Sequence, residues 1–116
     1  MGSKDMQVVT IPAVGRDRQF AYEQEVSLSA ISNSDWIVIP EDVNSVAVTL
    51  IVAGGGKGKV QATTDSIADV VADNATGIDW DFGEVDANTQ DVAMPPTAIR
   101  LVQTFAGSVS LKVRAQ

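Results

Sequence analysis

Short runs of alternating apolar and polar residues recur along this chain of 116 residues, and they restrict its possible folds more than any other feature. No segment of ten or more residues carries apolar side chains at the spacing of an amphipathic helix. The runs are separated by Gly, Pro, Asn and Asp, which is typical of strands joined by turns. The pattern therefore predicts an all-β protein with about eight strands.

The C-terminal residues give the clearest prediction of a hairpin. Two runs with apolar side chains at alternate positions flank the turn-forming pair Ala106-Gly107. Their predicted inward-facing residues are Ile99, Leu101, Phe105, Val109, Leu111 and Val113. Upstream, residues 45–53 are almost continuously apolar and rich in β-branched residues, which is typical of a strand covered on both faces. Together these runs predict a two-layer antiparallel β-sandwich, with Val48 and Leu50 also in its core.

Two further regions have distinct patterns. Residues 57–63 follow a run of three glycines, and their alternation places Lys57 and Lys59 on one polar, basic face. Residues 64–72 have helix-like spacing over one short turn, with Thr64 or Asp65 as the expected cap.

The chain is expected to form one domain, residues 19–116, preceded by an N-terminal arm, residues 1–18. The arm contains a short strand pattern at Gln7–Ile11 and two arginines, Arg16 and Arg18. Such an arm can add a strand to an open sheet edge of a neighbouring copy while its arginines pair with carboxylates there. The alternative is a loose terminus without a partner.

Charge is unevenly distributed along the chain, whose formal net charge is −7. Residues 65–91 contain eight acidic residues and no basic ones, whereas the other seven acidic and eight basic residues sum to +1. Because an acidic protein is repelled by nucleic acids and anionic membranes, neither is expected as a partner. The polarity suits head-to-tail or lattice contacts between copies, and the alternative is a solvated acidic loop.

The absence of His and Cys removes most of the usual catalytic chemistry. Such a chain has no Ser-His-Asp triad, no thiol nucleophile and no common zinc or iron–sulfur ligand set. The glycine-rich residues 53–59 do not match a phosphate-binding loop, because Val60 follows where Ser or Thr is required. Asp79 and Asp81 are weak candidates for metal ligands, since the residues around them lack EF-hand spacing. We expect no enzymatic activity and no cofactor.

The aromatic residues allow two interpretations. A platform for stacking sugar rings would use Tyr22, Trp36, Trp80 and Phe82. However, Ile78, Trp80 and Phe82 recur at every second position, which is how a strand places apolar side chains in a core. We therefore expect a core or a subunit interface here.

The second half of the chain carries four motifs in a recognisable order. They are Val60-Gln61-Ala62-Thr63-Thr64-Asp65-Ser66, Ile78-Asp79-Trp80-Asp81-Phe82-Gly83-Glu84-Val85, Pro96-Thr97-Ala98-Ile99-Arg100-Leu101 and Gly107-Ser108-Val109-Ser110-Leu111-Lys112-Val113. This order resembles small virion proteins of tailed bacteriophages, in particular capsid decoration (cement) proteins and related head or tail accessory proteins. The resemblance implies a jelly-roll-like sandwich that forms dimers or trimers on the capsid and has no catalytic residues. The N-terminal half resembles no known family.

The expected function is therefore that of a structural virion protein, made in the host cytoplasm, which stabilises a phage head through contacts with itself and with the major capsid protein. The candidate interface residues are Arg16, Arg18, Lys57, Lys59, Trp36 and Trp80. The first alternatives are a phage tail or fibre accessory protein and a non-catalytic carbohydrate-binding β-sandwich module. The last alternative is an enzyme, a carboxylate-dependent hydrolase.

Overall fold

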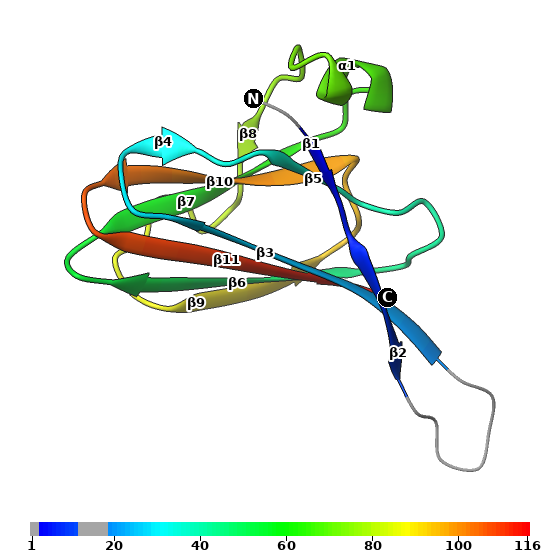
Figure 1. Cartoon of the computed structure of the whole chain (residues 1–116), viewed down its shortest axis with the longest axis horizontal. Coiled ribbons are helices and arrows are strands. Elements are labelled where there is room, and N and C mark those ends of the chain that lie inside the picture. Colours follow the sequence, from blue (N-terminus) through cyan, green and yellow to red (C-terminus); the bar gives the residue numbers. More distant parts are fainter. Residues whose placement is uncertain (1–2, 12–18) are drawn as a thin grey trace.

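Two β-sheets packed face to face make up most of the computed structural model, which describes residues 3–11 and 19–116 (Figure 1). Sheet A has the order β1-β5-β10-β7-β8, and β4 also pairs with β10. Its strands are β1 (Ser3–Asp5), β4 (Ser32–Asn33), β5 (Trp36–Val38), β7 (Lys57–Thr63), β8 (Ile78–Asp79) and β10 (Ala98–Phe105). Sheet B has the order β2-β3-β11-β6-β9. Its strands are β2 (Gln7–Ile11), β3 (Gln19–Leu28), β6 (Val46–Ala53), β9 (Thr89–Ala93) and β11 (Ser108–Ala115).

The strands pair in the manner of a jelly roll. From β3 onward, the first strand pairs with the last, β11, and moving inward along the chain β5 pairs with β10, β6 with β9 and β7 with β8. All of these pairs are antiparallel, as expected when one long hairpin folds into two sheets: β3, β6, β9 and β11 lie in sheet B, and β5, β7, β8 and β10 lie in sheet A. The prediction of an all-β, jelly-roll-like sandwich is therefore confirmed.

The core lies between the two sheets and follows the predicted alternation. The six residues expected there, Val48, Leu50, Ile99, Leu101, Leu111 and Val113, are all buried in one cluster. The prediction that residues 45–53 are covered on both faces is wrong, because Ala47, Thr49 and Ile51 are only half-buried on the outer face of sheet B.

Alternation fails at the end of β10. Phe105 was expected to face inward, but it is exposed, and Gln103 is buried instead. The pairing of β10 with β7 shifts register between these two residues, as at a β-bulge. Gln103 Nε2 donates hydrogen bonds to the carbonyl oxygens of Phe105 and Gly107, both at 3.0 Å, so the buried amide holds the hairpin turn.

The predicted helical turn is present as α1 (Ile67–Val71), but its cap differs. Ser66 is the N-cap, and its hydroxyl accepts a hydrogen bond from the Asp69 amide at 3.2 Å. Val70 of α1 packs against Trp36 and Ala98 on the outer face of sheet A. No helix among the described residues is long and apolar enough to cross a membrane.

The described part of the predicted arm belongs to the two sheets of its own chain. β1 pairs in parallel with β5 in sheet A, and β2 pairs antiparallel with β3 in sheet B. Met6, between them, is buried in the main core. The segment therefore borders both sheets on one side of the sandwich, while β8 and β9 border them on the other. Arg16 and Arg18 lie outside the described residues.

Candidate functional site

The side of the sandwich bordered by β8 and β9 carries a groove of about 520 Å³. Each of these strands is the last in its sheet, so its outer edge has no neighbouring strand among the described residues. The groove is lined by residues of both strands and of the segments that follow them, including Ile78, Trp80, Asp91, Val92, Met94 and Pro96. We refer to this region as the open side.

Large apolar side chains are exposed on the open side. Ile78 and Val92 are each 66% exposed, and Met94 is 84% exposed. Of the two alternatives for Ile78, the core is excluded, because β8 is only two residues long and pairs at the sheet edge, where the groove opens to solvent, whereas the subunit interface stays a prediction. The sequence pattern also did not predict β9, which contributes Val92 and leads to Met94.

Trp80 lies at the inner end of the groove and joins the two sheets. It is buried in the main core, and its Nε1 donates a hydrogen bond to Asp91 Oδ2 on β9 at 2.6 Å. Its backbone N–H donates to the carbonyl oxygen of Val60 on β7 at 2.8 Å. The core interpretation of Trp80 is confirmed, and the indole also fixes the Asp91 carboxylate between the sheets.

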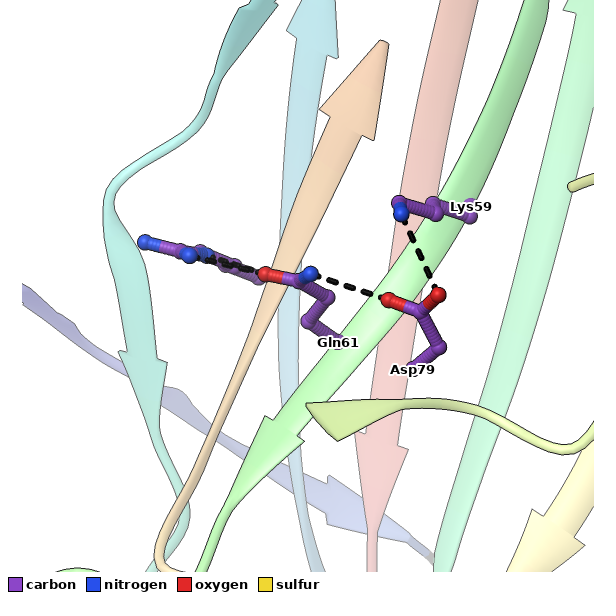
Figure 2. A network of polar contacts seen from close by, with 4 residues as sticks. Lys59, Gln61 and Asp79 are labelled. Atoms are coloured by element: carbon purple, nitrogen blue, oxygen red, sulfur yellow. Dashed lines mark hydrogen bonds and ion pairs between the residues drawn. The ribbon is translucent and has the colours of Figure 1, made fainter. Parts of the chain in front are cut away.

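Asp79, one of the two metal candidates, belongs to a network of side chains on the outer face of sheet A (Figure 2). Its carboxylate accepts hydrogen bonds from Lys59 Nζ at 3.1 Å and from Gln61 Nε2 at 2.9 Å. The Gln61 hydrogen bond, followed by the Lys59 hydrogen bond, lowers the pKa of Asp79 below its ordinary value. Both carboxylate oxygens are thus occupied by protein donors.

Asp81, the other candidate, is exposed on the segment that follows β8. Among the residues that the structure describes, no group of three or more Asp or Glu side chains is placed to hold a metal ion. The structure therefore does not bring Asp79 and Asp81 together in a metal centre.

The network continues from Gln61 to Trp36. Gln61 Oε1 accepts hydrogen bonds from Arg100 Nε at 2.9 Å and Nη2 at 2.7 Å. The Arg100 guanidinium stacks on the Trp36 ring at 4.4 Å, and burial lowers the pKa of Arg100. Trp36 itself is buried beneath α1, so it is unavailable as a surface residue in the folded chain.

The basic residues of the described strands from β7 onward all contact side chains of their own chain. Lys57 lies over the Phe105 ring at 5.5 Å, and Lys59 binds Asp79. On the outer face of sheet B, Arg114 pairs with Glu23 at 2.9 Å, and Lys112 pairs with Glu25 at 4.0 Å. In contrast, the acidic residues Asp81, Glu84 and Asp86 next to the open side are exposed.

No protein-family model matches this sequence, and no curated protein matches it. Among solved structures, the chain is similar to a protein from the study "Bacillus endospore appendages form a novel family of disulfide-linked pili", with a TM-score of 0.47 and 10% identity over 96% of this chain and 89% of that one. It is also similar to Aeromonas hydrophila PliG, a periplasmic lysozyme inhibitor of g-type lysozyme, with a TM-score of 0.40 and 16% identity over 99% of this chain and 100% of that one. With TM-scores this low, neither similarity bears on function.

Proposed function

We propose that the protein is a structural component that works by binding other protein surfaces, and specifically that it is a homo-oligomeric decoration protein of a tailed-phage capsid. The observation that carries the proposal is the open side, where the outer edges of β8 and β9, unpaired among the described residues, flank a groove with three large exposed apolar side chains. Free edges and clustered apolar side chains are both features of protein–protein contact sites.

The polar and aromatic side chains considered as possible ligands or catalytic groups support this proposal, because they contact one another within the fold. Asp79, Lys59, Gln61 and Arg100 bind one another, and Trp80 binds Asp91 across the sandwich. Jelly rolls are common in viral capsid proteins, although they also occur in lectins, so the fold alone does not select between these functions. The motif resemblance in the second half of the chain favours the virion role.

The test is to follow an epitope-tagged copy in cells that produce the phage encoding it. Heads, tails and soluble protein are separated on a density gradient, and the tag is measured in each fraction. A decoration protein is expected with the DNA-filled heads. Recovery with tails would instead favour the accessory role, and recovery only in the soluble fraction would remove the virion proposal.

A matched pair of variants tests whether the open side makes the contact. Ile78→Lys places a charge in the groove, whereas Ile31→Lys places one at a residue that is equally exposed, at 67%, and does not line the groove. Ile78→Lys is expected to reduce head occupancy, and Ile31→Lys is expected to leave it unchanged. Equal occupancy of the two variants would exclude the open side as the capsid contact.

The carbohydrate-binding alternative has a surface of its own. A shallow hollow of about 770 Å³ on the outer face of sheet B is lined by polar side chains, among them Gln7, Glu23, Gln90 and Arg114. Sugar recognition here would use hydrogen bonds without stacking, because none of the described residues that line the hollow is aromatic. A glycan that raises the melting temperature of the wild type, and not that of Glu23→Ala, would favour this function.

A further inference from the structure

We propose that the partner bound at the open side is a second copy of this chain, which presents its β1–β2 edge, so that copies associate head to tail. This inference rests on the proposed function, because it identifies the two surfaces that make the homo-oligomeric contact. The interface is heterologous: the open side of one copy contacts the β1–β2 side of the next copy.

The sheet order supplies the first argument. β9 and β2 are the two outer strands of sheet B, and β8 and β1 are the two outer strands of sheet A. One contact between the β8–β9 side and a neighbour's β1–β2 side therefore joins both sheets across the two copies. β2 and β9 are each five residues long, so their free edges match in length.

Strand direction is compatible with this continuation. Four successive antiparallel pairings separate β2 from β9, so these two strands run in the same direction. In sheet A, one parallel and three antiparallel pairings make β1 and β8 run in opposite directions. A second copy in the same orientation would therefore add β2 parallel to β9 and β1 antiparallel to β8, and both arrangements form regular ladders.

Exposed apolar side chains lie on both surfaces. Val8 on β2 is 59% exposed and is in register with Tyr22, whose side chain packs against the core. Residues in register share a face of the sheet, so Val8 faces the layer between the sheets. Asp91 of the groove is in register with the buried Val48 and faces the same layer. A neighbour's Val8 would therefore be directed toward the groove.

Charge selects this pairing over a symmetrical one. Two open sides in contact would bring together two copies of the groove carboxylates Asp79, Asp81 and Asp91, and of these Asp79 is paired with Lys59. Among the described N-terminal residues 3–11, the charged ones are Lys4 and Asp5, which are both exposed on β1 and whose charges cancel. The five basic residues of the described strands from β7 onward already contact side chains of their own chain. The β1–β2 edge of a second copy therefore adds no net negative charge when it meets the acidic open side.

The first test uses two variants that each block one surface. Val92→Glu adds a charge to the open side, and Val8→Glu adds one to the β2 edge; both residues are exposed, and retained folding is checked by circular dichroism. Each variant alone is expected to remain monomeric at a concentration at which the wild type associates. An equimolar mixture is expected to form dimers with one copy of each and no larger species, because each variant keeps one intact surface. Ile31→Glu is the control and should associate like the wild type.

The second test traps the contact directly. Because the chain contains no cysteine, single Cys variants give unambiguous disulfides. A mixture of Val8→Cys and Met94→Cys is expected to form the mixed disulfide faster than either variant dimerises with itself, and faster than Ile31→Cys reacts with Met94→Cys. Preferential Met94→Cys homodimers would show a symmetrical contact and overturn the proposal, as would a rate of mixed disulfide formation no higher than that of the Ile31→Cys control.

These outcomes are separable from those for the proposed function. Tagged protein on phage heads without the mixed disulfide would retain the virion role and remove the head-to-tail contact. The mixed disulfide without particle association would retain the contact and remove the virion role.

Discussion

Gln61 shows how individual polar side chains serve the fold of this protein. Its amide oxygen accepts from Arg100 on β10, and its amide nitrogen donates to Asp79 on β8 (Figure 2). A single side chain of β7 therefore connects the strands on either side of it. The short β8 has only two backbone pairing positions with β7, so side-chain contacts of this kind help to hold it in place.

The lowered pKa of Asp79 predicts a pH-dependent contribution to stability. Because the folded state favours the carboxylate, the contribution is fully present above the ordinary pKa of 3.8 and is lost as the pH falls through the lower folded-state pKa. Asp79→Asn should therefore be less stable than the wild type near neutral pH, with the difference shrinking below about pH 4. Denaturant unfolding at several pH values measures this. Asp81→Asn is the control, and an equal, pH-dependent loss in both variants would contradict the assignment to the network.

At the scale of elements, alternation is a reliable guide where a strand lies in the middle of a sheet with one face on the core. β10 and β11 are such strands. The residues predicted to face inward are buried as far as Leu101 in β10 and from Val109 to Val113 in β11. Alternation fails where a register shift occurs, as between Gln103 and Phe105. It also fails at the edges: β9 (Thr89–Ala93) has a single large apolar residue, Val92, and that residue faces solvent.

The same reasoning explains what the sequence could predict of the site. Asp79, Trp80 and the acidic block were visible as residues of interest, because charge and aromatic content are read directly from sequence. The groove depends on which strands end each sheet, and that follows from pairings between residues far apart in the chain, such as Thr49 with Gln90. A short stretch of sequence does not predict which distant strand it pairs with.

Replacement of Leu101 tests the register of the core. Its side chain is fully buried at the centre of β10, so Leu101→Ala should lower the free energy of unfolding by about 2–5 kcal/mol. Val102→Ala, at the half-buried neighbouring position on the other face, should cost less. Denaturant melts give both values, and a smaller loss for Leu101→Ala than for Val102→Ala would invert the assigned faces.

The β10–β11 turn depends on close contact with the β6–β7 turn. Gly107 has φ +151°, and a Cβ there would overlap the Gly56 backbone nitrogen. Gly54 also has a positive φ, +64°, but its nearest neighbours would lie 3.9 Å from an added Cβ. Gly54→Ala should therefore cost about 1–2 kcal/mol for conformational strain alone. Gly107→Ala should cost more, because backbone atoms must move, and equal melting temperatures for the two variants would show that the turns separate easily.

For the whole molecule, the two sides of the sandwich differ in how their edges are covered. All eight strands of the jelly roll lie within residues 19–116, and β1 and β2 are additions along one side. The N-terminal residues are therefore not needed for the topology of the roll. They contribute the burial of Met6 and provide the outer edges that the head-to-tail contact requires.

Deletion of residues 1–11 separates these two contributions. We expect the truncated chain to keep its β-sheet circular dichroism but to lose stability, with about 1.5–3 kcal/mol from Met6 alone. It should no longer associate with itself, because it lacks the β1–β2 edge. It should still bind full-length protein through its intact open side, and so shorten full-length assemblies when added in excess. Met6→Ala is the matched control: it loses the same buried side chain but keeps both edge strands, so it should be less stable and still associate. Self-association of the truncated chain at the wild-type level, measured by sedimentation, would show that the N-terminal edge is not the surface that meets the open side.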